Sequence, residues 1–183
     1  PEAQLEAVDF LIAQYATEAN RAEMQRAREC VARAGAAFAR LYPELGRGVV
    51  HGDYNCYNLL FDDAGGVAGV FDLDWAWREA RLFDVARGAV FFGCAREGES
   101  DTASIWSLTR APRHDAQGIA AFVAAYDESA PQPLTAAERR ALPEAILAQW
   151  ASWRIEGAMK VPEDRRAEFF LYTFFEPYGW FSR

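Results

Sequence analysis

Hydrophobic residues near the start of the chain recur at intervals of three and four, the period of an amphipathic helix. This pattern predicts helix over residues 3–40, with Asn20 or Gly35 marking a break. Pro43 and the glycines that follow it end the helical segment. The first quarter of the chain is therefore expected to be helical.

The period changes after residue 48. Val49 and Val50 lead into the segment HGDYNCYN, and two apolar runs follow it at residues 58–62 and 67–72. Short apolar runs separated by the turn-forming segment DAGG (63–66) are typical of a β-hairpin. We therefore predict two short strands joined by this turn.

The turn also predicts which residues of the hairpin face each other. If it centres on Gly65, with Gly66 in the left-handed conformation, paired residue numbers sum to 130 and Asn58 faces Asp72. An amide oxygen and a carboxylate would then meet near Asp53. Such oxygens suit Mg²⁺, which takes one or two carboxylates and leaves its other positions to water or phosphate.

The remainder of the chain again has helical periodicity. Helices are predicted from Leu82 to a stop at Gly93, over 115–126, and from a capping box at Thr135–Glu138 to about Met159. Pro143 is expected to interrupt the last of these, and Pro162 to be the first residue of a final helix. The polar stretch 96–104 is predicted to be irregular.

These elements predict an α+β fold, mostly helical, in a single domain of 183 residues. Residues 1–48 would be helical, residues 49–74 would form the loop and hairpin that carry the polar motif, and residues 82–183 would form a second helical part. There is no internal repeat and no linker that divides the chain.

Composition narrows the classes of function. The chain is 51% hydrophobic and 25% charged, which is globular, and its net charge of −8 argues against a nucleic-acid partner and is compatible with a cationic substrate. Three widely spaced cysteines favour reduced thiols in the cytoplasm. No apolar run is long enough for a membrane span, and the aromatic stretch 169–181 is expected to be a buried terminal helix.

The spacing of the polar motif matches a kinase pattern. In protein kinases a catalytic-loop Asp is followed, after four intervening residues, by a metal-binding Asn, and a later Asp also binds metal. Here His51-Gly52-Asp53, Asn58 and the segment VFDLD (70–74) keep that order and spacing. Over residues 49–93 the chain resembles the aminoglycoside phosphotransferase and choline kinase superfamily of kinase-like small-molecule phosphotransferases.

The resemblance implies a protein-kinase-like C-terminal lobe and a set of roles. Asp53 would be the catalytic base, or would orient the attacking hydroxyl, while Asn58 and Asp72 would hold Mg²⁺ against the phosphates of ATP. His51 would fix the loop by hydrogen bonds. Asp84 would tie the catalytic loop down, unless it is a simple helix N-cap.

Some positions near the motif leave their role open. Asp74 and Glu79 are candidate metal or substrate contacts. Trp75 and Trp77 would line the acceptor pocket or pack in the core. The loop residues Tyr54, Cys56 and Tyr57 differ from the His, Pro and Gly common in relatives, so the resemblance does not identify the acceptor.

Three functions follow from these residues. The first is ATP-dependent, Mg-assisted phosphoryl transfer to a hydroxyl of a small molecule such as an aminoglycoside, homoserine or choline. The second is a catalytically silent kinase-like lobe that binds or scaffolds. The third, a metal-dependent hydrolase built on His51 and Asp53, lacks further ligands, because the only other histidine, His114, has no partner spacing.

The nucleotide-binding half of a kinase has no counterpart in this sequence. Neither a glycine-rich phosphate loop nor a P-loop motif occurs, and the chain has a single lysine, Lys160, against eighteen arginines. The chain also begins with Pro1. We therefore expect it to be one lobe of a larger enzyme, to require an N-terminal lobe as partner, and to be inactive alone.

Overall fold

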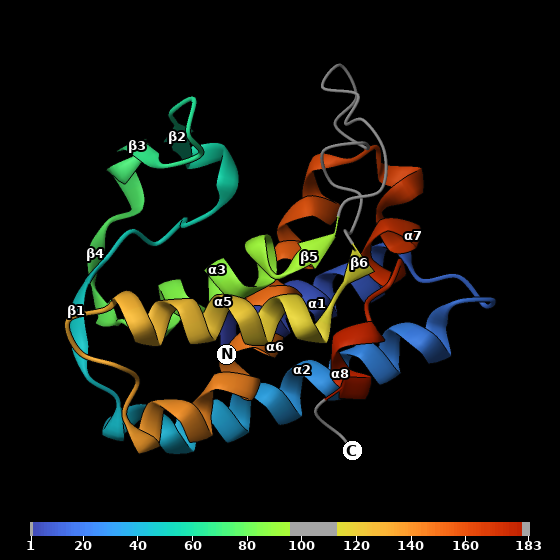
Figure 1. The fold of residues 1–183 in the computed structure, drawn as a ribbon. Coiled ribbons are helices and arrows are strands. Elements are labelled where there is room, and N and C mark those ends of the chain that lie inside the picture. The colour runs from blue at the N-terminus through green and yellow to red at the C-terminus, as the bar shows by residue number, and fades with distance from the viewer. Residues whose placement is uncertain (1, 96–112, 181–183) are drawn as a thin grey trace.

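The protein is mostly helical, with small antiparallel sheets, which confirms the predicted α+β class (Figure 1). The structure is a computed structural model that describes residues 2–95 and 113–180, so the stretch 96–104 predicted to be irregular lies outside it. The helices are α1 (Glu2–Tyr15), α2 (Arg21–Leu41), α3 (Leu82–Phe92), α5 (Ala116–Ser129), α6 (Ala136–Lys160), α7 (Arg166–Leu171) and α8 (Glu176–Trp180). The strands are β1 (Arg47–Val50), β2 (Leu59–Phe61), β3 (Val67–Val70), β4 (Trp77–Ala80), β5 (Cys94–Ala95) and β6 (Arg113–His114). Single 3-10 turns are η1 (Tyr42–Glu44), η2 (Cys56–Asn58), η3 (Leu73–Trp75) and η4 (Glu163–Arg165).

The first helical segment breaks at Asn20 and not at Gly35. The side-chain oxygen of Asn20 accepts a hydrogen bond from the backbone N–H of Thr17 at 2.7 Å, which closes the turn between α1 and α2. Gly35 lies buried within the continuous helix α2. A single glycine costs a helix about 1 kcal/mol, too little to end a long helix that buries one face.

Helix α6 continues through Pro143, so the predicted interruption is wrong. The predicted capping box at its start is confirmed, because Thr135 and Glu138 exchange side-chain-to-backbone hydrogen bonds. Proline removes only one backbone hydrogen bond, and this one lies within two turns of the helix start. The buried side chains of Ala141, Ala145 and Ile146 hold α6 in place on both sides of it.

Helix α6 runs through the middle of the molecule and packs against α2, α3 and α7 (Figure 1). Its C-terminal half joins α1, α2 and α7 in one apolar cluster around Met24, Phe169 and Phe170. Its N-terminal half joins α3 and α5 in a second cluster around Leu82 and Trp150. The scaffold behind the polar motif is therefore helical.

The end of the described chain is not one long helix. Pro162 was predicted to be the first helical residue, but it is the N-cap of the turn η4, one residue before the observed start at Glu163. The aromatic segment splits into α7 and α8. Thr173, between them, has a left-handed backbone with φ 54°. Phe169, Phe170 and Phe174 are nevertheless fully buried, in agreement with the predicted core role of this segment.

Strand β4 was not predicted from the sequence. It pairs antiparallel with β1, with Arg47 opposite Ala80 and Val50 opposite Trp77. The pairing joins the start of the polar motif to the start of α3. The hairpin formed by β2 and β3 stands away from the helices, at the upper left of Figure 1.

Candidate active site

The segment His51-Gly52-Asp53 forms a loop that leaves β1 and passes close under η3. Gly52 has φ +82°, and a Cβ atom at this position would lie 2.2 Å from the backbone oxygen of Trp75. Both the left-handed backbone and the close approach require glycine. This is the physical reason why glycine separates the histidine from the aspartate in the motif.

Asp84, in the first turn of α3, holds the same loop from the other side. Its carboxylate accepts hydrogen bonds from the backbone N–H groups of His51, at 2.5 Å, and Gly52, at 3.0 Å. The N-cap position of α3 belongs to Arg81, so Asp84 is not the cap of its helix. Two charge-assisted hydrogen bonds fix the loop relative to α3.

The His51 side chain is buried and connects the loop to the hairpin. Its Nε2 lies 2.7 Å from the backbone oxygen of Phe71, and its Nδ1 accepts a hydrogen bond from the Asp53 N–H at 3.3 Å. Both contacts fit a neutral imidazole with its proton on Nε2. His51 therefore positions the residues on either side of it.

The Asp53 carboxylate is held at both oxygens. Its Oδ1 forms an ion pair with the guanidinium of Arg87, from α3, and its Oδ2 accepts a hydrogen bond from Nδ2 of Asn58 at 3.0 Å. The same Asn58 nitrogen donates to the Asp53 backbone oxygen at 2.9 Å. Asn55 braces the loop further by donating to that oxygen. The carboxylate thus has one fixed orientation.

The hairpin forms as predicted, but its register differs by one residue. Leu59 pairs with Val70, and the Phe71 N–H donates to the backbone oxygen of Asn58 at 2.9 Å, so Asn58 faces Phe71 and not Asp72. Two local features differ from the prediction: Gly65, not Gly66, takes the left-handed conformation, and the pairing is irregular between Leu60 and Phe61, where Phe61 pairs with Val67. The Asp62 carboxylate caps this turn by accepting from the N–H groups of Ala64 and Gly66.

Asp72 follows directly after this pair and has a left-handed backbone, with φ 57°. Such a conformation is uncommon for a residue with a side chain and occurs often at functional sites. The Asp72 side chain is exposed to solvent. The side-chain nitrogen of Asn58 binds Asp53, so the side-chain oxygen of Asn58 is the atom that could bind a ligand. That Asn58 and Asp72 bind one metal ion stays a prediction.

The chemistry of the donor set fits magnesium better than zinc. Among residues 2–95 and 113–180, no three His, Cys, Asp or Glu side chains gather closely enough to hold a metal ion by themselves. An amide oxygen with one carboxylate is instead the incomplete set that Mg²⁺ accepts when phosphate and water complete its shell. Asn58 and Asp72 supply such a set.

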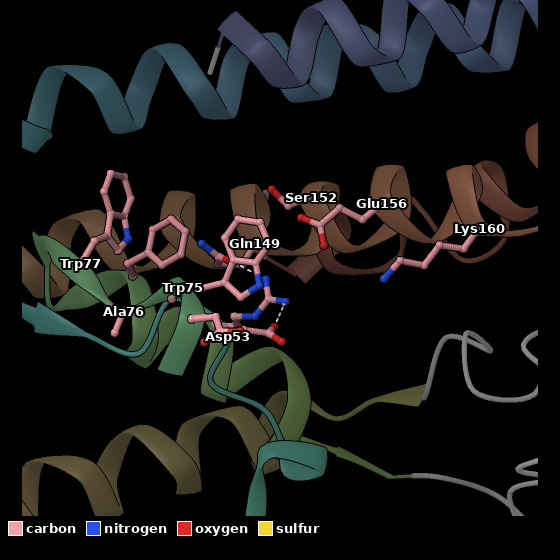
Figure 2. A pocket seen from close by; sticks show the side chains of 12 residues that line it. Asp53, Trp75, Ala76, Trp77, Gln149, Ser152, Glu156 and Lys160 are labelled. Atoms are coloured by element: carbon pink, nitrogen blue, oxygen red, sulfur yellow. Dashed lines mark hydrogen bonds and ion pairs between the residues drawn. The ribbon is translucent and has the colours of Figure 1, made fainter. Parts of the chain in front are cut away.

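A cavity of about 630 Å³ opens beside Asp53, between the loop and α6 (Figure 2). Its volume is within the range of small-molecule sites. It is lined by Gly52, Asp53, Asp74, Trp75, Ala76, Trp77, Phe83, Arg87, Gln149, Ser152, Glu156 and Lys160. Trp75 and Trp77 are 68% and 53% exposed, so they belong to this cavity and not to the core.

The cavity wall opposite Asp53 was missed in the sequence. Helix α6 contributes Gln149, Ser152, Glu156 and Lys160, which Figure 2 shows along one side of the helix. Their spacing of three and four residues, in a helix that is otherwise largely buried, is the signal that marks a polar stripe. Arg87 had no comparable signal, because a single arginine in an apolar helix does not reveal its partner.

Glu156 has an altered acidity. Glu156 is exposed on the wall of the cavity, but partial loss of hydration there raises the pKa of its carboxyl. The positive charges of Arg87 and Lys160 oppose this shift, and the negative charge of Asp53 adds to it. Glu156 therefore keeps its proton to a higher pH than a fully solvated glutamate. The cavity presents carboxyl groups, two cations and two indole rings to a ligand.

Of the two remaining candidate metal or substrate contacts, Asp74 lies at the cavity and Glu79 does not. Asp74 lines the cavity, next to Trp75. Glu79 is buried on β4, where it accepts hydrogen bonds from the Tyr42 hydroxyl and the Ala80 N–H, and it is not among the residues that line the cavity. The hydrogen bond to Glu79 also raises the pKa of the Tyr42 hydroxyl. In the structure Glu79 fastens β4 to η1.

Comparison with known proteins gives a match to a protein family. Residues 1–126 of the 183 match the model of the phosphotransferase enzyme family, a stretch that contains the loop, the hairpin and α3. The comparisons with curated proteins and with solved structures gave no significant match. None of the described helices is both long enough and apolar enough to cross a lipid bilayer.

Proposed function

Because the chain belongs to the phosphotransferase enzyme family, we propose that it transfers the terminal phosphoryl group of ATP to a hydroxyl of a small molecule. The observation that carries this proposal is the Asp53 carboxylate, fixed at both oxygens and lining a cavity of about 630 Å³. The acceptor binds in that cavity, between the indole rings of Trp75 and Trp77 and the polar stripe of α6.

Asp53 accepts a hydrogen bond from the acceptor hydroxyl and orients the hydroxyl oxygen toward the terminal phosphorus atom of ATP. As the new P–O bond forms, Asp53 takes the hydroxyl proton, and the bond from that phosphorus to the bridging oxygen breaks with ADP as the leaving group. The restraint on its carboxylate matters because phosphoryl transfer depends mainly on positioning and electrostatic stabilisation. His51 and Asp84 keep the loop that carries Asp53 in place through the hydrogen bonds described above.

Asn58 and Asp72 would hold Mg²⁺. Both residues lie at the open end of the hairpin, where the backbones of Asn58 and Phe71 are hydrogen-bonded. A magnesium ion bound there supplies positive charge that stabilises the phosphates. Asn58 would then have two functions, because its nitrogen orients Asp53 and its side-chain oxygen would serve as a metal ligand.

We further propose that this chain is the C-terminal lobe of a kinase-like enzyme and that another lobe covers the hairpin. Among the described residues, ten of the thirteen exposed large hydrophobic side chains fall within residues 49–77. Exposed apolar side chains gathered on one part of a protein favour an interaction surface. A glycine-rich cover for the nucleotide would come from that lobe. Because the reaction consumes ATP, we propose a cytoplasmic location.

The experiment that tests the function is phosphoryl transfer by the enzyme assembled with its nucleotide-binding lobe. Asp53→Asn should lower kcat by roughly 100-fold or more, the scale of a positioned base, while ATP affinity changes little. The matched control is Asp63→Asn, an exposed aspartate in the hairpin turn, which should not change kcat. Turnover of Asp53→Asn close to that of the unmodified enzyme would remove Asp53 from the mechanism.

A further inference from the structure

We propose that Arg87 is a positioning residue that holds Asp53 in its working orientation; the proposal rests on the function proposed above. Arg87 lies in the middle of α3, 34 residues beyond Asp53 in the chain. Its Nη2 forms the ion pair with Oδ1 of Asp53, while Nδ2 of Asn58 holds Oδ2. Arg87 and Asn58 therefore restrain the two oxygens of one carboxylate.

Arg87 is itself held rigidly. Its side chain is 11% exposed, its Nη1 lies 3.4 Å from the side-chain oxygen of Gln149, and its guanidinium carbon lies 5.4 Å from the ring centre of Phe91. Phe91 lies on α3 and Gln149 on α6, and both helices belong to the helical scaffold. The position of Asp53 is in this way tied to the helical body and not only to its own loop.

Stability alone does not explain a buried arginine at this place. Its Nε is buried and has no hydrogen-bond partner among the described residues, although a buried polar atom without a partner is costly. A buried ion pair is also weak support for a fold, because desolvation opposes its attraction. The arrangement is better explained by what it does to Asp53.

The consequence for catalysis is geometric. Small displacements of a reacting group from its productive position cost large factors in rate. Without the guanidinium, Oδ1 of Asp53 would lose its anchor and the carboxylate would rotate about the remaining contact with Asn58. Arg87 also lines the acceptor cavity, but its loss should lower kcat, through Asp53, by a much larger factor than it changes acceptor binding.

The test compares Arg87→Met and Arg87→Lys in the assembled enzyme. We expect kcat to fall roughly 100-fold for Arg87→Met and roughly 10-fold for Arg87→Lys, which keeps the charge but not the fork of donors, with both KM values within about threefold. The matched control is Arg154→Met, which removes another buried arginine, one that donates a hydrogen bond to the backbone oxygen of Phe169 on α7. Melting temperatures of all variants separate unfolding from lost positioning.

A double-mutant cycle distinguishes this proposal from the function on which it rests. If Arg87 acts through Asp53, adding Arg87→Met to Asp53→Asn lowers kcat no further. A further loss equal to that of Arg87→Met alone would overturn the positioning role, as would a raised acceptor KM with unchanged kcat, which would make Arg87 a binding residue. If the unmodified assembled enzyme transferred no phosphoryl group to any small-molecule hydroxyl, the proposed function itself would fail.

A structural readout does not depend on turnover. In a crystal structure of Arg87→Met, the Asp53 carboxylate should be rotated away from the position it has here. In Arg87→Lys it should remain near that position. An unchanged Asp53 side chain in both variants would contradict the role of Arg87, whatever the rates are.

Discussion

A side chain at Gly52 would collide with the backbone of Trp75: a Cβ atom built there lies 2.2 Å from the Trp75 oxygen. The loop that carries Asp53 and the turn that carries the exposed tryptophans are therefore pressed against each other, backbone to backbone. Gly52 and Trp75 both line the cavity, so their contact forms part of its wall.

The first prediction compares the cost of the steric collision at Gly52 with the cost of a left-handed backbone alone. Gly65 also has a left-handed backbone, with φ +81°, but nothing lies within 4 Å of a Cβ there. Gly65→Ala should lower the free energy of unfolding by about 1–2 kcal/mol through strain alone. Gly52→Ala should cost more, about 3 kcal/mol or above, because a collision is added. Urea denaturation measures both.

The control for that pair is Gly48→Ala, on β1. A Cβ at Gly48 has open space around it and its φ is not left-handed, so the change in unfolding free energy should stay within about 0.5–1 kcal/mol. A Gly52→Ala protein as stable as Gly65→Ala would show that the loop moves away from Trp75 at no cost.

The second prediction concerns Asp84. Asp84→Ala removes the acceptor of the His51 and Gly52 N–H groups, and each hydrogen bond to a charged group contributes about 1.5–3 kcal/mol. We expect both lower stability, by urea denaturation, and a loss of turnover. Asp115→Ala, which removes the N-cap of α5, should cost about 1 kcal/mol and leave turnover unchanged. Equal turnover in the two variants would remove Asp84 from loop positioning.

The third prediction tests the proposed metal ligands. Asp72→Ala should weaken the binding of Mg-ATP, measured by calorimetry in the assembled enzyme, more than it weakens the binding of metal-free ATP. Asp63→Ala removes the same charge from the turn of the same hairpin and should affect neither. If Asp72→Ala weakened both forms equally, its effect would be one of general charge and not of metal binding.

The fourth prediction is a pH dependence of stability. The hydrogen bonds of Arg81 to Glu138, with those from Thr135, lower the pKa of Glu138 from its usual 4.5 to about 2. A carboxyl whose pKa is lower in the folded protein stabilises it above the unfolded pKa, and that stability is lost as the pH falls from about 4.5 toward 2.

Glu138→Gln should therefore lower the free energy of unfolding at pH 7, by something on the order of 2 kcal/mol, and the difference should shrink as the pH falls below 4.5. Urea denaturation at several pH values measures this. Glu168→Gln is the control, because its partner Arg165 is exposed and exposed ion pairs contribute little. If the loss of unfolding free energy in Glu138→Gln stayed the same at low pH, the loss would come from packing and not from the charge of Glu138.

The fifth prediction is that this chain alone binds Mg-ATP poorly and shows no turnover above background. A kinase needs a glycine-rich cover over the phosphates and a lysine that pairs with them. The sequence has no such loop, and its one lysine, Lys160, lies in the cavity wall on α6. Calorimetry of the purified chain tests this. Micromolar binding of ATP would contradict the need for another lobe.

The local structure of this protein was largely determined by its sequence. The helix from Leu82 to a stop at Gly93 and the capping box of Thr135 and Glu138 formed as predicted. The hairpin also formed, with its register shifted by one residue and with Gly65 in place of Gly66 in the left-handed conformation. Each depends on hydrogen bonds and side-chain contacts between residues that are close in the chain. For the same reason the spacing from Asp53 to Asn58 was enough to indicate that the two belong to one loop.

Only the tertiary structure decided the rest. It paired β4 with β1, and it placed Arg87 and the polar stripe of α6 beside Asp53. The physical reason is that these contacts join segments up to about a hundred residues apart. They are selected by the packing of α3 and α6 around a shared core, and no local pattern of residues encodes which polar side chains then meet across the cavity.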